Sequence, residues 1–160
     1  MADAMKLAAA QKVYATVCAA LDERGWKYDR DDEKLIIRTG VRTEDLPVHH
    51  IIIVDVERQV LRMASPIPLE MGADKRTEGA IITTVATMGL RDGNFDYNLQ
   101  TGRIVFRLTA SFRGSEIGKG LAHYFIDCTN AVVDLYNDRF EAVNSGKMSV
   151  ADFIEQEKNN

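Results

Sequence analysis

Residues that would point to a specific chemistry are scarce in this chain. Only two of its 160 residues are cysteines, Cys18 and Cys128, and both fall at apolar positions of helical patterns. We therefore expect reduced cysteines in the core, as in cytoplasmic proteins, rather than a disulfide. The longest apolar run, residues 51–54, is far too short to cross a lipid bilayer.

An excess of charge of one sign is also missing. The formal net charge is -4, and lysines and arginines are scattered singly among acids. These features argue against binding to nucleic acid or to an anionic membrane surface. Residues 1–10 lack the basic segment of a secretion signal, so we expect a cytoplasmic protein. The length suits one domain spanning residues 1–160.

Motifs of catalysis and nucleotide binding are absent from the sequence. There is no nucleophile elbow, triad signature or glycine-rich dinucleotide fingerprint. The segment "FRGSEIGKGLAHY" is reminiscent of a phosphate loop, but Arg113 stands where the first glycine belongs. Gly120 stands where the loop needs a hydroxyl. We predict a turn and a helix start at Gly118-Lys119, with at most weak anion binding.

Metal-ligand patterns are incomplete as well. His49 and His50 are adjacent in a predicted strand and so point to opposite faces, and His123 is the only other histidine. An acidic turn lacks the glycine and the distant glutamate of a calcium loop, and we interpret it as solvated. Its acids are Asp29, Asp31, Asp32 and Glu33; the isolated carboxylates elsewhere are Asp96, Asp127 and Asp134. We expect no metal, no cofactor and no catalysis.

What is present is helical periodicity in four places. Apolar residues three or four apart predict helices over residues 4–24, 74–90 and 119–143, and a short one starting at Ser149. Gly25 is placed to end the first, and Ser149 with Asp152 forms a capping box for the last. The predicted inward residues are Leu7, Ala10, Tyr14, Val17, Cys18 and Leu21; Ile81, Ile82, Val85 and Met88; and Leu121, Phe125, Cys128, Val132, Leu135 and Tyr136.

Strand patterns come in groups rather than alternating with helices. We predict strands at 26–28, 35–39, 49–56 and 59–64, then at 93–99 and 103–109, with Pro66 and Pro68 ending the fourth. Hairpin grouping favours an α+β fold with a twisted antiparallel β-sheet packed by helices. The predicted order is α-ββββ-α-ββ-α-α.

One hairpin carries a family resemblance. In "GNFDYNLQTGRIVFRL" the side chains alternate, and Gly102 supplies the turn. Together with the preceding "ATMGL", the following long helix and its "GKMS" start of a short helix, it resembles the YbjN-like family. That family has a fold similar to type III secretion chaperones, and it often carries asparagine where this chain has Thr84 and Thr87. The resemblance spans about residues 5 to 155 and brings no catalytic residues.

The resemblance implies a homodimeric, chaperone-like or regulatory bacterial protein, of a family labelled as regulators of sensory transduction, that binds other proteins. Apolar residues on both faces of 49–56 agree, because a second apolar face is buried best by a partner. Burial by loops and the last helix is the alternative. The candidate partner or dimer surface is Ile52, Val54, Val56, Arg103, Val105 and Arg107. The alternative function is a small-molecule sensor or weak enzyme, with a pocket between helix and sheet lined by Thr84, Asp96, Asn98 or Arg107.

Overall fold

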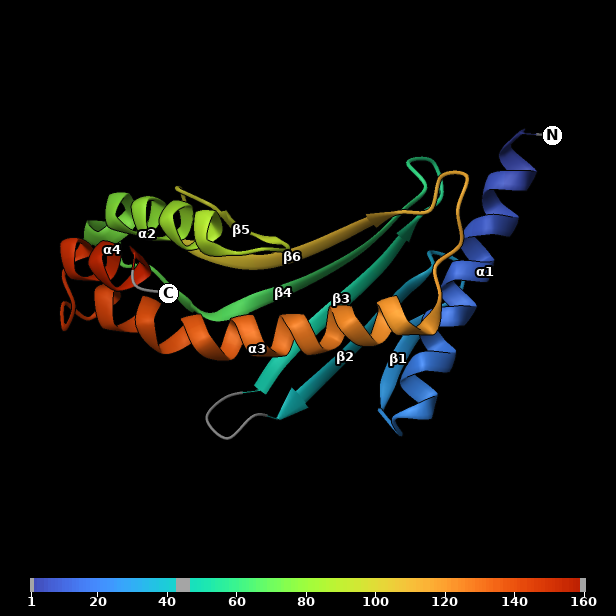
Figure 1. Ribbon diagram of the computed structural model, residues 1–160, viewed down its shortest axis with the longest axis horizontal. Coiled ribbons are helices and arrows are strands. Elements are labelled where there is room, and N and C mark those ends of the chain that lie inside the picture. Colours follow the sequence, from blue (N-terminus) through green and yellow to red (C-terminus); the bar gives the residue numbers. More distant parts are fainter. Residues whose placement is uncertain (1, 43–46, 159–160) are drawn as a thin grey trace.

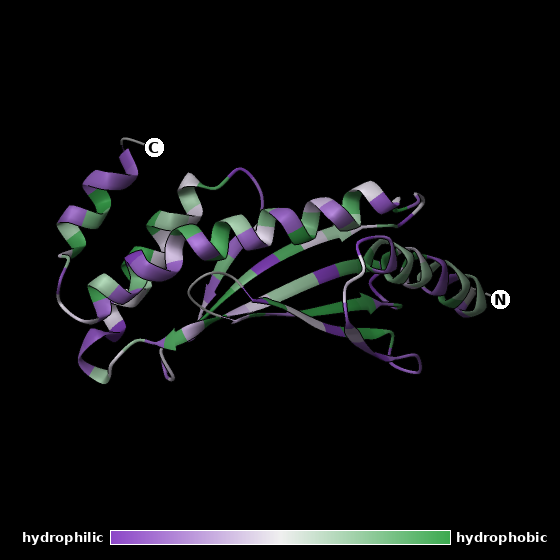
Figure 2. Cartoon of the chain, turned by 90° about the horizontal axis from the view of Figure 1, so that it is seen from below, coloured by the Kyte–Doolittle hydropathy of each residue, from purple (hydrophilic) through white to green (hydrophobic). Residues whose placement is uncertain are grey.

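Four helices lie on one side of a six-stranded antiparallel sheet (Figures 1 and 2). This arrangement comes from a computed structural model, which describes residues 2–42 and 47–158. The sheet order is β1-β2-β3-β4-β6-β5. The elements are α1 (Ala2–Glu23), β1 (Tyr28–Asp31), β2 (Ile36–Arg42), β3 (Pro47–Asp55), β4 (Val60–Glu70), a 3-10 turn (Ala73–Lys75), α2 (Arg76–Gly89), β5 (Asn94–Tyr97), β6 (Arg103–Ser111), α3 (Lys119–Asn144) and α4 (Val150–Lys158). The predicted α+β class and element order are confirmed.

The helix ends follow from local chemistry. Gly25 has a φ of 66°, and its N–H and that of Trp26 bond back to the last turn of α1. Ser149 Oγ accepts the N–H of Asp152 at 3.0 Å and donates to its carboxylate at 2.7 Å. Both predicted caps are therefore present.

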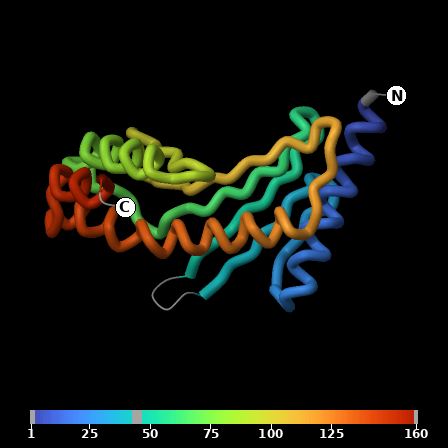
Figure 3. The backbone as a smooth tube through the Cα atoms, viewed as in Figure 1, coloured from blue at the N-terminus to red at the C-terminus, as the bar shows by residue number. Residues whose placement is uncertain are grey.

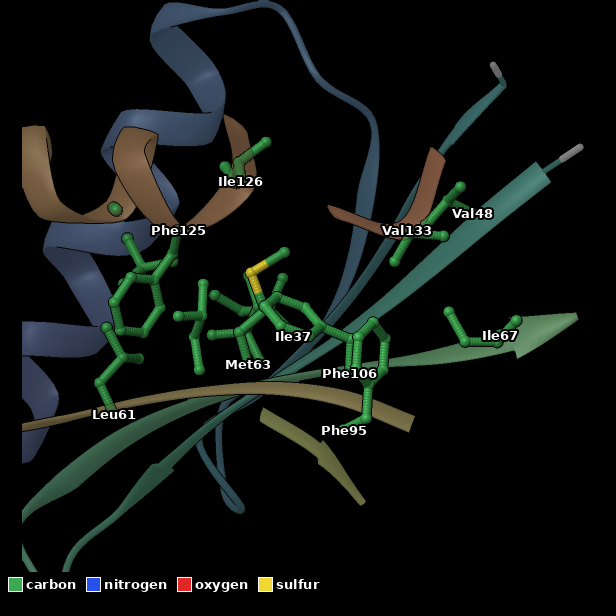
Figure 4. Close-up of a cluster of buried hydrophobic side chains, with 14 of the residues drawn as sticks. Ile37, Val48, Leu61, Met63, Ile67, Phe95, Phe106, Phe125, Ile126 and Val133 are labelled. Carbon is green, nitrogen blue, oxygen red and sulfur yellow. The ribbon is translucent and has the colours of Figure 1, made fainter. Parts of the chain in front are cut away.

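The core lies between the sheet and the helices (Figure 4). Alternate residues of β3, β4 and β6 are buried against α3, which crosses the strands for about 39 Å at 1.5 Å per residue. Phe106 and Phe140 are fully buried, and Phe95 packs edge-on against Phe140 with ring centroids 5.0 Å apart. Burying such side chains stabilises the fold by roughly 1.5–3 kcal/mol each.

The strand β4 continues through both prolines to Glu70, so the predicted end near Ala64 is wrong. The pairing of β3 with β4 ends at Ile51 and Ala64, and beyond that point β6 is the one strand of the described residues that pairs with β4. A proline nitrogen lacking hydrogen is tolerated where one neighbouring strand is absent. The bend of β4 away from β3 is visible in Figure 3.

Helix α2 packs with a different face than the sequence predicts. Its buried residues are Gly79, Ile82, Thr83 and Ala86, whereas Ile81 is 41% and Met88 81% exposed. Small residues face inward because α2 packs closely against its neighbours. A Cβ on Gly79 would lie only 2.5 Å from the Tyr97 hydroxyl. Two other residues predicted to be inward, Leu7 of α1 and Leu135 of α3, are also exposed.

The short helix α4 is fixed to α3 by a buried polar cluster. Arg139 forms an ion pair with Glu157, and its guanidinium lies 4.9 Å from the ring centre of Phe153. The Tyr136 hydroxyl donates to Glu157 at 2.8 Å, and burial together with this bond raises the pKa of Tyr136 to about 12. Phe153 is completely buried, and it anchors this helix in the core. Helix α4 lies at the opposite end of the molecule from α1 (Figure 3).

Candidate functional site

The candidate functional surface is the face of the sheet on which none of the described helices lies, and we call it the open face. Figure 2 shows the described helices on the opposite side of the strands. Side chains alternate along each strand, so every second residue points to this face. Its members are Asp29 and Asp31; Ile36, Arg38, Gly40 and Arg42; Pro47, His49, Ile51, Ile53 and Asp55; Val60, Arg62, Ala64, Pro66, Pro68 and Glu70; Arg103, Val105, Arg107, Thr109 and Ser111; and Asn94 and Asp96.

The centre of the open face is apolar. Ile53 lies opposite Ile36 on β2, and Ile51 lies opposite Ala64 on β4. These four side chains are only half-buried, unlike the residues that alternate with them. Three contiguous strands therefore present an apolar strip that no described helix covers.

Ion pairs occupy the side of the open face formed by β4, β5 and β6. Arg107 donates to Asp96 of β5 at 3.0 Å, and Arg103 donates to Glu70 of β4 at 2.6 Å. Beside them is a hollow of about 410 Å³, lined by Asp55, Arg58, Val60, Arg62, Arg107 and Thr109. Its charge is mainly basic, because three arginines face one aspartate.

The six residues predicted as one partner surface divide between the two sides of the sheet. Ile52 and Val54 are 3% and 2% exposed and belong to the core, while Val56 is partly buried in the turn after β3. Arg103, Val105 and Arg107 lie on the open face. The grouping on one face is thus wrong, since the helices cover the Ile52 side of β3. Ile51 and Ile53 take their place on the open face; partner contact stays a prediction.

The two adjacent histidines point to opposite sides, as expected from strand geometry. His49 is exposed, whereas His50 is buried with Nδ1 2.6 Å from Ser65 Oγ and Nε2 3.0 Å from Asn130 Oδ1. Burial lowers the pKa of His50 to about 4. Within residues 2–42 and 47–158, no group of three or more His, Cys, Asp or Glu side chains is arranged to hold a metal.

The other sequence candidates have structural partners. Lys119, after the glycine that precedes α3, pairs with Glu23 of α1. Asp29 and Asp31, predicted in an acidic turn, belong to strand β1, and the turn begins after Asp31. Asp31 accepts the N–H of Lys34, and Asp32 pairs with Arg30. Asp127 binds Arg24 through both oxygens, at 2.5 and 2.8 Å. The pairs of Lys119 with Glu23 and of Arg24 with Asp127 join α1 to α3, whereas the contacts of Asp31 and Asp32 lie within the hairpin of β1 and β2.

The residues predicted to line a pocket between helix and sheet lie in different places in the described structure. Thr84 is exposed and donates to the carbonyl of Ala80, while Asn98 holds the turn before β6 by accepting backbone N–H groups. Asp96 and Arg107 pair on the open face. A hollow of about 580 Å³ lies elsewhere, at the ends of β1, β2 and β3. It is lined by Lys27, Tyr28, Asp29, Arg38, Thr39, Gly40, Val41, Arg42, Pro47, Val48 and His49.

Of the two threonines near the end of α2, Thr84 and Thr87, one has a clear structural role. Thr87 Oγ1 accepts the N–H of Phe95 at 3.0 Å, which ties α2 to the edge strand β5. The cysteines are both free, Cys18 buried and Cys128 half-buried. Among the described residues, no helix is long and apolar enough to span a membrane.

Comparison with known proteins identifies the fold. By sequence, no protein-family profile and no curated protein matches the chain. By structure, the chain is similar to the crystal structure of YbjN from E. coli, described as "a putative transcription regulator", with a TM-score of 0.61. The match covers 83% of this chain and 92% of that protein at 10% sequence identity. The fold expected from the hairpin resemblance is therefore confirmed.

Proposed function

We propose that this chain is a non-enzymatic, cytoplasmic, chaperone-like or regulatory protein that acts as a homodimer and binds a partner protein through its open face. One observation carries the proposal: the apolar strip around Ile51 and Ile53 is left without a covering helix. Exposed apolar strips of this kind are typical of protein-binding surfaces. A regulatory role is in keeping with the description of the structurally similar YbjN.

The test replaces the strip and follows binding. In the variant Ile51→Asp/Ile53→Asp, both changes are at half-exposed positions, so the fold is retained and circular dichroism checks it. Affinity capture from the native cell extract should recover a partner with the unchanged chain and lose it with the variant. Light scattering at micromolar concentration should report a dimer. A monomer that captures nothing would refute the proposal.

A small-molecule sensor is the second candidate, favoured by the hollow of about 580 Å³ at the ends of β1, β2 and β3. Arg38 and His49, both on the open face, offer basic groups there. A ligand that binds only the native state must raise the unfolding temperature. A thermal-shift screen against metabolites and nucleotides separates the two functions, because a clear rise favours the sensor.

A further inference from the structure

Two arginines flank the apolar centre of the open face, and each is directly beside one of the central isoleucines. Arg38 of β2 lies opposite Ile51, and Arg62 of β4 lies opposite Ile53. Both arginines are exposed, and neither has an ion-pair or hydrogen-bond partner in the described part of the chain. An unpaired guanidinium is a ready ligand for a carboxylate, which it can bind through two N–H groups.

The two arginines are spaced for one extended segment. They lie two strands apart and are offset by two residues, because Ala64 rather than Arg62 is opposite Ile51. Strand spacing and rise then place their backbones about 12 Å apart. In an extended peptide, residues four apart on one face are about 13 Å apart. A segment that reads acid, apolar, acid on one face therefore matches Arg38, the isoleucines and Arg62.

A second copy of the same face offers poor charge complementarity. Four of its five acids are already held in ion pairs within the chain, namely Asp31 with Lys34, Asp55 with Arg58, Glu70 with Arg103, and Asp96 with Arg107. Only Asp29 lacks such a partner among the described residues. Two open faces packed together would thus bring arginines near arginines, with only Asp29, which lies opposite Arg38 on the neighbouring strand β1, free to compensate among the described residues.

We propose that the open face binds an extended acidic segment of a different protein. The segment places an apolar side chain on Ile51 and Ile53 and one carboxylate on each of Arg38 and Arg62. This inference rests on the proposed function and specifies the chemistry of its partner. The basic hollow beside Arg62 and Arg107 gives room for the second carboxylate.

The experiment uses the full chain and two short fluorescent peptides of defined sequence. One has the alternating core Glu-Thr-Ile-Thr-Glu, and the other has glutamine in place of both glutamates. Fluorescence anisotropy should show the acidic peptide binding about tenfold more tightly, because each of its two carboxylates can pair with one exposed arginine. Its affinity should fall as salt is added.

Matched variants locate the effect on the protein. Arg38→Gln/Arg62→Gln should weaken binding of the acidic peptide about tenfold and leave the glutamine peptide unchanged. Lys147→Gln, which removes a positive charge in the turn between α3 and α4, should change neither. Equal affinities for the two peptides, or no binding of the acidic one, overturn the inference.

Two further results separate this inference from the proposed function. If Ile53→Asp converts a dimer to a monomer, a second copy occupies the open face and the acidic-segment inference fails. If the peptides fail while a partner is still captured in an Ile53-dependent manner, protein binding stands and only the acidic specificity is lost. If the peptides do not bind and no partner is captured, both the acidic-segment inference and the proposed protein-binding function are refuted.

Discussion

At the scale of single residues, His50 is the buried polar group whose environment should be most sensitive to pH. It fills the point where β3 and β4 separate, with Ser65 on one ring nitrogen and Asn130 of α3 on the other. The ring of Trp26 stacks 6.3 Å away. Neither bonded group is an anion. The bond to Asn130 favours the protonated ring, but the loss of solvation on burial outweighs it, and His49 next to it also opposes a second positive charge.

We predict that acid destabilises the fold through this histidine. The pKa falls from 6.5 in the unfolded chain to about 4 in the fold. Between these pH values the unfolded state therefore binds more protons than the folded state. The stability that neutral His50 contributes is fully present above pH 6.5 and is lost as the pH falls toward 4. The loss is about 3 kcal/mol, from roughly 1.4 kcal/mol per pKa unit.

Urea unfolding at pH 7 and pH 4.5 measures this effect. The variant His50→Gln keeps hydrogen-bonding groups near Ser65 and Asn130 but cannot titrate, so it isolates the histidine from the carboxylates. The unchanged chain should lose more stability than His50→Gln over this range. Parallel losses in both proteins would show that His50 is not responsible.

At the scale of elements, α2 gains its position from a glycine rather than from a large apolar residue. Gly79 leaves room for Tyr97, whose hydroxyl donates to the carbonyl of Arg76 at 2.9 Å. We predict that Gly79→Ala destabilises the fold by about 1–3 kcal/mol, although alanine favours helices. The added methyl would also crowd Met71, at 2.7 Å from Cγ.

The matched control is Gly120→Ala in the first turn of α3, where an added Cβ meets nothing within 4 Å. This change should stabilise the chain by up to about 1 kcal/mol. Opposite signs for the two glycine substitutions, measured by urea unfolding, would establish the close packing of α2. A stabilising Gly79→Ala would contradict it.

Helix α4 depends on one buried ion pair. Glu157→Ala would leave Arg139 buried without its carboxylate, at a cost of roughly 3–5 kcal/mol unless the helix detaches. We predict detachment, seen as faster amide hydrogen exchange across Val150–Lys158 than elsewhere. Lys158→Ala, which removes an exposed pair with Glu155, should leave exchange in α4 unchanged. Uniformly faster exchange would instead indicate general loss of stability.

The sequence predicts where helices and strands lie better than it predicts which of their faces are buried. Residue alternation and hairpin turns identify the strands and their order, and caps at Gly25 and Ser149 locate helix ends. The candidate site was harder to predict. Alternation shows that Ile51 and Ile52 lie on opposite faces of the sheet, but it does not show which of the two faces the helices cover. Arg38 and Arg62 carried no local motif, since only the register of β2 and β4 on β3 brings them beside the isoleucines.

At the scale of the whole molecule, two exposed surfaces suggest two separate contacts. Ile81 and Met88 are seven residues apart on α2, so they share its outer face, while the open face lies on the other side of the sheet. We predict that the proposed homodimer forms through this outer face of α2. The substitution Ile81→Asp/Met88→Asp should give a monomer in light scattering, because a buried dimer contact does not tolerate two carboxylates.

The same variant should still bind the partner of the open face, since Ile51 and Ile53 remain intact on the opposite side. The converse variant, Ile51→Asp/Ile53→Asp, should remain dimeric and lose the partner. Both changes replace solvent-accessible apolar residues, so neither removes core packing, and circular dichroism provides the check on folding. A dimer that persists without Ile81 and Met88 but is lost without Ile51 and Ile53 would place self-association on the sheet. In that case the open face could not be the partner's binding surface in the dimer, because the second copy would already cover it.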